Sequence, residues 1–276
     1  DVYGHSDQER GDAASDVTNI LLLGTDNRPA TGSLNTDVIM IVSLRPDPRS
    51  AVIVSIPRDT YMDPEGWLPA KANSFYASAR RYDKEGAYDM VRKIYSEFVE
   101  VPIDYVVQIN FKAFEDIVDA LGGITVDVDM DMRYVDPTDG TDINLRKGEQ
   151  LLNGKQALDF IRYRQRNDGT GISSDLQRNA RQQQVVASII GKVKSYETII
   201  RAGGLLDAVG NNVKTSIPRD EMIKLLKTYA GIDNEQVEFI RLEGVWKRPY
   251  VWPNEDSLTE IRQKLKEQMT SDRSSE

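Results

Sequence analysis

The sequence contains no cysteine and a single histidine, His5. Without cysteine there is no disulfide framework, no thiolate metal site and no cysteine nucleophile. Because the one histidine lies in a polar N-terminal stretch, a histidine-based catalytic triad or metal cluster is excluded. Any acid–base or metal chemistry must therefore rely on carboxylates and other oxygen groups.

Long apolar runs are also missing. No run approaches the roughly 18 residues that cross a membrane, and no signal peptide is visible. The chain begins with aspartate rather than methionine. We therefore expect residues 1–17 to be a flexible polar tail, with an N-terminal membrane anchor that the sequence does not include.

Several binding signatures are absent as well. A net charge of −9 disfavours general nucleic-acid binding, and without a helix-turn-helix signature a DNA-binding regulator is not favoured. There is no GxxxxGK(S/T) loop, no GxGxxG after a strand, and no kinase HRD or DFG set. A phosphate ligand would need another kind of site.

Apolar periodicity alternates between strand-like and helix-like along the chain. Strands are predicted at 19–23, 38–44, 51–56, 104–109, 124–129 and 237–240, and a short polar turn joins the second and third as a hairpin. Helices are predicted at 87–98, 114–121, 185–193, 222–229 and 258–269. This mixture predicts one α/β domain over residues 18–270, a single mixed β-sheet flanked by helices.

Charged residues stand at the ends of three predicted strands. Asp26 and Arg28 follow the first, Asp37 precedes the second and Arg58 follows the third. Ligand sites in α/β sheets favour strand ends, and two neighbouring carboxylates suit Mg²⁺, which takes oxygen ligands together with water and substrate phosphate. For each segment alone, ordinary turn chemistry or a local ion pair is the alternative.

Two later segments add arginines. If residues 160–166 are extended, Arg162 and Arg164 share one face and form an anion clamp, with a charged edge strand as the alternative. Arg178, Arg181 and Gln182 share a helix face by their spacing. Because cations at a helix start oppose the macrodipole, a nearby anion is indicated, with a solvated helix start as the alternative.

An excess of arginine at element ends, in an acidic protein, favours a small acidic ligand. A pyrophosphate held by arginines and one Mg²⁺ fits this pattern. The hypothesis requires that Arg58, Arg162 and Arg178 meet at one pocket.

A family resemblance joins these segments. Over about residues 17–195 the chain contains, in this order, NILLLGTDNR, NTDVIMIVSL, VSIPRDTYM, KANSFYASAR, IDYVVQINFKAFEDIVDALGGITVDV, LRKGEQLLNGKQALDFIRYR and DLQRNARQQQVV. Together these stretches resemble the LytR-CpsA-Psr family of cell-wall ligases. The resemblance implies a catalytic domain on the outer face of the bacterial cytoplasmic membrane, held by a single N-terminal helix. It also implies transfer of teichoic acid, capsule or a similar glycopolymer from a polyprenyl (undecaprenyl) pyrophosphate carrier to peptidoglycan, commonly at the 6-hydroxyl of N-acetylmuramic acid.

The resemblance also assigns roles. It implies that Asp26 and Asp37 bind the metal, Mg²⁺ or Mn²⁺, and that the pyrophosphate is bound by Arg58, Arg162, Arg164, Arg178 and Gln182, with Arg28 and Arg181 in the same motifs. Lys71 and Asn73 match a K-x-N stretch. Gln177 stands where the family usually has glycine, which implies a differently shaped loop.

The resemblance further implies an apolar groove for the lipid. Its candidate lining residues are Phe111, Phe114, Val118, Leu121, Val186 and Ile190. Apolar stripes on helices usually face a core, and the sequence does not separate a core stripe from a groove lining.

For the chemistry itself, Asp37 or Asp26 is the expected proton acceptor, with a metal-bound water as the alternative, and Arg58 belongs to the catalytic set. Two alternatives to a ligase stay open: a hydrolase that cleaves the lipid pyrophosphate with water, and a non-catalytic carrier of polyprenyl phosphate or glycan. Transfer and hydrolysis differ only in the acceptor.

Overall fold

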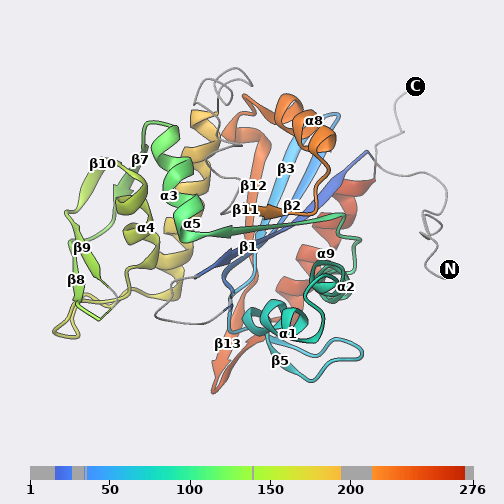
Figure 1. Ribbon diagram of the computed structural model, residues 1–276, viewed down its shortest axis with the longest axis horizontal. Coiled ribbons are helices and arrows are strands. Elements are labelled where there is room, and N and C mark those ends of the chain that lie inside the picture. The colour runs from blue at the N-terminus through green and yellow to red at the C-terminus, as the bar shows by residue number, and fades with distance from the viewer. Residues whose placement is uncertain (1–15, 27–33, 35, 139, 194–212, 271–276) are drawn as a thin grey trace.

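The computed structural model describes residues 16–26, 34, 36–138, 140–193 and 213–270. A six-stranded sheet in the order β11-β6-β1-β2-β3-β12 forms its centre (Figure 1). Its strands are β1 Thr18–Thr25, β2 Thr36–Pro46, β3 Arg49–Ser55, β6 Tyr105–Asn110, β11 Val213–Thr215 and β12 Val237–Arg241. The predicted mixed sheet is therefore confirmed, and β2 and β3 pair antiparallel as the predicted hairpin.

The strand directions bring polar residues to one edge of this sheet. β6 and β12 run parallel to β1 and β3, respectively, whereas β2 is antiparallel to both β1 and β3. The carboxyl ends of β1, β3, β6 and β12 therefore meet the beginning of β2 at the same edge. Asp26, Asp37 and Arg58 all lie there, because each adjoins one of these strand ends.

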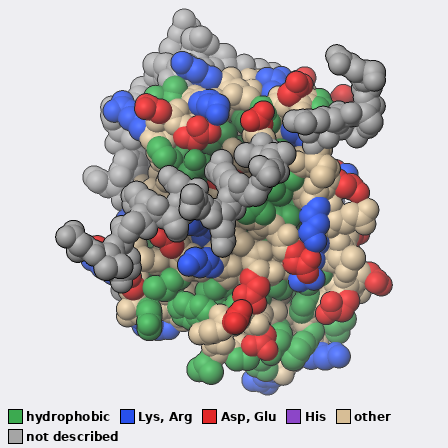
Figure 2. Space-filling view, turned by 90° about the vertical axis from the view of Figure 1, so that its right-hand side faces the viewer, with side chains coloured by type: hydrophobic (Ala, Val, Ile, Leu, Met, Phe, Trp, Pro, Cys, Tyr) green, Lys and Arg blue, Asp and Glu red, His purple; other side chains and the backbone are tan. Residues whose placement is uncertain are grey.

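One face of the sheet is covered by α1 (Phe75–Tyr82), α2 (Ala87–Val99) and α9 (Glu255–Met269). Alternate residues of the strands point to this face, and Leu21, Ile41 and Val54 are fully buried there. Figure 2 views the molecule from the side on which α2 and α9 lie in Figure 1, and shows charged side chains of both signs over it, with hydrophobic ones gathered in the lower part.

The opposite face packs against α5 (Asp175–Lys192) and α8 (Arg219–Tyr229). Here Leu22, Val42 and Leu44 remain only partly buried beside the α5 residues Val186 and Ile190. The two faces thus differ, since the first belongs to a sealed core and the second keeps partly accessible apolar side chains.

A second hydrophobic cluster lies beside the sheet. It is formed by α3 (Phe111–Ala120), α4 (Gly154–Arg162), part of α5, and two hairpin-like pairs, β7 (Ile124–Val128) with β10 (Gly148–Leu152) and β8 (Met132–Asp136) with β9 (Thr141–Leu145). In β7 buried and exposed residues alternate strictly, as predicted. The glycine stop after α3 is also confirmed, since Gly122 and Gly123 have φ of 75° and 86°.

Short elements complete the description. β4 (Tyr61–Met62) pairs with β5 (Ala70–Lys71), and β13 (Gly244–Lys247) pairs with β14 (Tyr250–Pro253). Two 3₁₀ turns span Ala72–Ser74 and Asn234–Gln236.

The prediction of an extended segment at 160–166 is wrong. Residues 154–162 form α4, because Asn153 and Gln156 make a reciprocal capping box at its start and Leu158 and Phe160 bury their side chains. Only Tyr163 and the residues after it leave the helix. α5 begins at Asp175, at a capping box of Ser174 and Gln177, and so contains the predicted helix start with Arg178 and Gln182 as well as the apolar positions from Val185 onward.

Two predictions concern membranes and the N-terminus. In the part of the chain that the structure describes, no helix combines the length and apolarity that spanning a membrane requires. The tail predicted at 1–17 falls almost entirely outside the described residues, as does Arg28.

Candidate functional site

Two neighbouring cavities open at the polar edge of the sheet. The larger, which we name the clamp cavity, has a volume of about 1080 Å³, and its lining includes the predicted residues Arg58, Arg162, Arg164, Arg178 and Gln182. The smaller, the side cavity, has about 560 Å³ and is lined in part by Lys71, Asn73 and Tyr250. The two cavities share Asp26, Asp37, Arg58 and Asp59. The arginines expected to meet at one pocket are thus brought together.

Alternating charges form the boundary between the cavities. Arg58 Nη1 lies 2.6 Å from Asp37 Oδ1, and its Nε lies 3.5 Å from Asp59 Oδ2. Lys71 Nζ donates to Asp59 Oδ1 at 2.8 Å. The backbone N–H of Asn73 donates to the carbonyl of Arg58 at 3.0 Å, which fixes the turn after β3. Lys71 and Asn73, whose roles the sequence leaves open, therefore hold Arg58 and Asp59 in place.

Positive charge is concentrated on the other side of the clamp cavity. The pKa of Arg164 is lowered, first by burial and then by the positive charges of Arg58 and Arg178, while Asp37 and Asp59 act in the opposite direction. The Arg164 side chain nevertheless reaches solvent. Repulsion among three guanidinium groups favours an anion that would neutralise them.

Arg162 reaches the clamp cavity from the last turn of α4, not from a strand. Its guanidinium lies 4.9 Å from the centroid of the Phe111 ring, at the start of α3. A cation at a helix C-terminus is favoured by the helix dipole, and the aromatic face adds a cation–π contact. Arg162 and Arg164 therefore share a cavity although the predicted alternation of an extended chain is absent.

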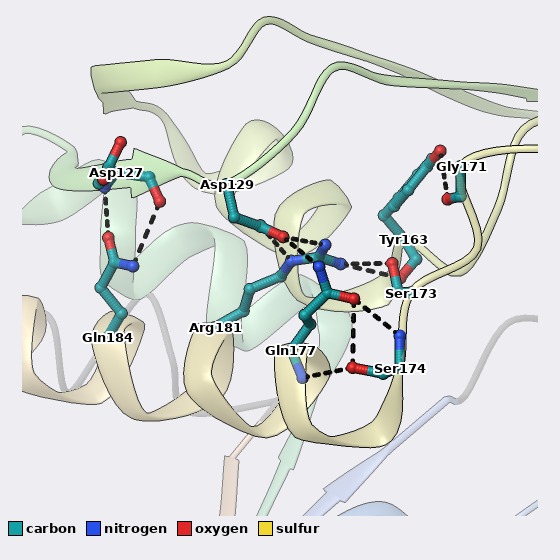
Figure 3. A network of polar contacts seen from close by, with 9 residues as sticks. All are labelled: Asp127, Asp129, Tyr163, Gly171, Ser173, Ser174, Gln177, Arg181 and Gln184. Atoms are coloured by element: carbon teal, nitrogen blue, oxygen red, sulfur yellow. Dashed lines mark hydrogen bonds and ion pairs between the residues drawn. The ribbon is translucent and has the colours of Figure 1, made fainter.

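Arg181 does not belong to this site, contrary to the prediction. Its side chain is 2% exposed, and its guanidinium makes a bidentate pair with Asp129, Nε–Oδ1 at 2.7 Å and Nη2–Oδ2 at 2.8 Å (Figure 3). Nη1 donates to Ser173 Oγ at 2.9 Å and to the Tyr163 carbonyl at 3.3 Å. Spacing alone placed Arg181 on the face of Arg178 and Gln182, but its ion pair with Asp129, just after β7, holds the guanidinium inside the protein.

Gln177 has a structural role in the same network (Figure 3). Its side-chain oxygen accepts from the Ser174 N–H at 2.9 Å, and its amide nitrogen donates to Asp129 Oδ2 at 3.2 Å. Where the family usually has glycine, this chain thus has a side chain that starts α5 and braces the ion pair. The resulting loop brings Arg178 to the clamp cavity at the first turns of the helix.

The carboxylates supply oxygen donors for a divalent cation. Asp26 and Asp37 line both cavities, and Asp37 is held by Arg58. Within the described ranges no group of three or more acidic, histidine or cysteine side chains is close enough to hold a metal. Two carboxylates suit Mg²⁺ only if phosphate oxygens and water complete its ligands, which is the usual arrangement for this ion.

The candidate groove residues divide into four groups. Phe111 lines the clamp cavity, and Val186 and Ile190 are partly buried against the more open face of the sheet. Phe114 and Leu121 are half-buried, the former against the second cluster. Val118 is completely buried in that cluster and is core, because α3 packs this side against β7 and α4.

Some residues that line the clamp cavity were not predicted from the sequence. Arg241 at the end of β12 and Trp246 in β13 line the clamp cavity, and Asp136 and Thr141 reach it from the β8–β9 pair. Arg241 carried a usable signal, since it directly follows an apolar strand as Arg58 nearly does. Trp246 carried none, because the sequence shows no periodicity that would place it near the sheet edge.

Comparison with known proteins gives a consistent result. The family model described as LytR_cpsA_psr family matches residues 3–272. A protein of Oceanobacillus iheyensis named polyisoprenyl-teichoic acid–peptidoglycan teichoic acid transferase TagU is 36% identical over 230 residues, which cover 83% of this chain and 68% of that protein.

Solved structures agree with the sequence match. The crystal structure of Bacillus subtilis TagV superposes with a TM-score of 0.73 at 27% identity, over 93% of this chain and 98% of that one. A structure described as TagT bound to LI-WTA superposes with a TM-score of 0.69 at 30% identity, over 92% and 91% of the two chains. Both the fold and the course of the chain are therefore shared over nearly the whole length.

Proposed function

The chain belongs to the LytR-CpsA-Psr family, and from that premise we propose that it is a transferase that moves a glycopolymer from a polyprenyl-pyrophosphate carrier to peptidoglycan. The relatives it resembles are named polyisoprenyl-teichoic acid–peptidoglycan teichoic acid transferases. A teichoic acid is accordingly the first glycopolymer to test as the donor. The carrier is the undecaprenyl lipid, and the domain works at the outer face of the cytoplasmic membrane on an N-terminal anchor.

One observation carries the proposal. Arg58 and Arg178 lie close enough to Arg164 to act on it electrostatically, and all three line one cavity together with Arg162, Arg241 and four aspartates. These cationic side chains come from separate elements of the fold. A cluster of like charges is unfavourable unless an anion is bound, so the cavity suits a diphosphate better than a neutral ligand.

The chemistry follows from the charges. The hydroxyl oxygen of the acceptor attacks the phosphorus that carries the glycan, the bond from this phosphorus to the bridging oxygen breaks, and lipid monophosphate leaves. Negative charge grows on the bridging oxygen as that bond opens. Arg162, Arg164 and Arg178 would stabilise it without reorganising, which is the largest contribution in many such sites.

The proton of the acceptor hydroxyl needs a base. The part of the chain that the structure describes contains no histidine, and Asp37 is the candidate that lines both cavities and pairs with Arg58. Arg58 orients this carboxylate and would contact the diphosphate as well, so it links the donor to the base. Asp26 is the second candidate.

The oxygen donors of Asp26 and Asp37 would hold Mg²⁺, or Mn²⁺ in its place. When bound, the ion would neutralise charge on the phosphate oxygens. The partly exposed apolar side chains between α5 and the sheet, among them Leu22, Val42 and Val186, would receive the prenyl chain.

The test is incubation of the chain with Mg²⁺, a lipid-pyrophosphoryl glycan carrying a label, and peptidoglycan fragments. Label on peptidoglycan, together with release of lipid monophosphate, is the result we expect. Free phosphorylated glycan alone would identify a hydrolase instead, and binding without either product would identify a carrier.

A further inference from the structure

An aromatic surface stands beside the two cavities. It comprises the β13–β14 pair and β4 beneath it, and we name it the aromatic hairpin: Tyr61, Trp246, Tyr250 and Trp252. The rings of Tyr61 and Trp252 stack with centroids 4.2 Å apart, and Tyr250 meets the edges of both at 5.2 and 6.2 Å. Trp246 and Trp252 are nonetheless 56% and 41% exposed. Large exposed aromatic side chains grouped in this way indicate a binding surface.

The hairpin is fixed to the site and not to a remote part of the fold. The Val251 N–H donates to the carbonyl of Asp59 at 2.8 Å, and the Asn254 N–H donates to the carbonyl of Glu243 at 2.8 Å. Gly244 allows close pairing, because a Cβ there would lie 2.5 Å from the Trp252 carbonyl oxygen. The aromatic side chains are therefore held at a set position relative to Asp59.

That position is where the two cavities meet. Trp246 lines the clamp cavity, and Tyr250 lines the side cavity. Lys71 Nζ lies 5.8 Å from the centroid of the Trp246 ring and 2.8 Å from Asp59 Oδ1. A ligand lying on these rings would thus reach the Arg58–Asp37 pair directly, because Arg58 and Asp37 line both cavities.

We propose that the aromatic hairpin binds the acceptor, a glycan strand of peptidoglycan, and presents its hydroxyl to Asp37. This inference rests on the proposed function, which requires a sugar acceptor next to the diphosphate. The face of a pyranose ring carries C–H groups with partial positive charge, and these pack on the negative face of an aromatic ring. Continuity with the clamp cavity favours the acceptor as the occupant, because the donor's diphosphate already occupies the arginine side.

Charge near the tip agrees with this occupant. Lys247, at the end of β13, and Arg248, in the turn to β14, are exposed, and Lys71 adds a third cation next to Trp246. The peptide stems of peptidoglycan carry carboxylates. In a chain with a net charge of −9, a basic rim around exposed rings complements such a polymer and opposes binding of neutral surfaces.

The experiment compares wild type with Trp246→Ala, Tyr250→Ala and Trp246→Phe, and uses Tyr82→Ala as the matched control. Tyr82 is an aromatic residue that is 82% exposed on α1 and lines neither cavity. Binding of soluble peptide-bearing glycan strands is measured first without donor, by tryptophan fluorescence for the tyrosine variants and by sedimentation with insoluble peptidoglycan for all. KM is then measured for acceptor and donor separately, and melting temperatures check the fold.

We expect the two alanine variants of the hairpin to weaken strand binding and raise the acceptor KM about fivefold or more, while the donor KM and the melting temperature stay unchanged. Trp246→Phe should keep most of the wild-type strand binding and acceptor KM, and Tyr82→Ala should match wild type in both. The inference would be overturned by an unchanged acceptor KM, or by a change in the donor KM instead. It would also be overturned if the alanine variants lost binding to anionic lipid vesicles rather than to glycan. Strand binding that depends on Trp246 in a chain without any transfer would keep the inference and refute the proposed function.

Discussion

Arg58 and Asp37 form an ion pair of 2.6 Å in which both side chains keep about a third of their surface accessible, 32% and 36%. The two residues come from neighbouring antiparallel strands, Asp37 from the start of β2 and Arg58 from the turn after β3. An exposed pair of this kind contributes little to folding stability. Its position on the wall between two cavities suits the proposed function, in which the arginine would exchange the carboxylate for a phosphate oxygen.

Replacing Arg58 by alanine should therefore separate activity from stability. We expect transfer to fall by about 100-fold or more, because one preorganised donor to the developing charge is lost. The melting temperature should change little. Initial rates of label transfer and a thermal melt measure the two quantities.

The matched control is Arg81→Ala, which removes an exposed arginine on α1 that lines neither cavity. It should transfer at the wild-type rate. If Arg58→Ala also retained that rate, Arg58 would have no part in holding the diphosphate.

The sequence was sufficient to predict where Asp26, Asp37 and Arg58 would lie, because each adjoins an apolar strand whose direction the hairpin settles. By the same rule Arg241 could have been found, since it ends β12 at the same edge. Local apolar patterns predict where a strand ends, and they therefore also predict the position of the side chains that immediately follow it.

Arg162 and Arg181 show where local patterns fail. The alternation of charged and apolar residues at 160–166 suits a strand for a few residues, yet the capping box of Asn153 and Gln156, seven residues earlier, decides for a helix. For Arg181 the decisive partner is Asp129, which lies 52 residues away in sequence. Helical spacing predicts which residues share a face, but not which of them is buried by a partner that is distant in the sequence.

Because Arg181 is buried, its replacement should affect folding. We expect Arg181→Met to lower the free energy of unfolding by about 3 kcal/mol, near the lower end for a broken buried pair since Asp129 is one-third exposed. Urea denaturation gives this value. Arg178→Ala serves as the contrast, because it should reduce transfer without a comparable loss of stability.

The same pair predicts an acid response. Burial raises the pKa of the Asp129 carboxyl, but hydrogen bonds and positive charge from Arg181 outweigh this effect and hold the pKa below its usual value. A carboxyl with a depressed folded-state pKa stabilises the fold above its unfolded pKa, and that contribution is lost as the pH falls through the folded value. Stability should thus decline as the pH falls below about 4.

Urea titrations at a series of acidic pH values measure the decline. The slope of the free energy of unfolding against pH should be smaller in Asp129→Asn, because asparagine does not titrate. A variant with the slope of wild type would show that other carboxyls dominate acid unfolding and that Arg181 gives Asp129 no stabilising preference for the charged form.

The apolar contacts of α5 predict a dependence on lipid length. Val186 is partly buried against the more open face of the sheet, so Val186→Asn should place a polar group where a prenyl chain would lie. We expect the KM for a long-chain donor to rise about tenfold, with little change for a donor whose chain is too short to reach α5.

Leu176→Asn is the control on the same helix, since Leu176 is 69% exposed and does not line the clamp cavity. It should leave both donors unaffected. An equal rise for long and short donors in Val186→Asn would instead indicate a general disturbance of α5 and would remove the groove from this face.

A last prediction concerns the metal. Asp26 and Asp37 are too few to hold Mg²⁺ tightly by themselves, so its affinity for the free chain should be weak and should increase when a soluble prenyl pyrophosphate supplies phosphate oxygens. By linkage, Mg²⁺ should tighten binding of the pyrophosphate by the same factor.

Calorimetric titrations of each ligand in the presence and absence of the other measure this coupling, which we expect to fall about tenfold in Asp26→Asn. Asp89→Asn, at an exposed position on α2, should keep the full coupling. Tight Mg²⁺ binding without the pyrophosphate, or equal coupling in both variants, would place the ion elsewhere. A coupling that only Asp26→Asn abolishes would instead place the metal at the same edge of the sheet as the arginines.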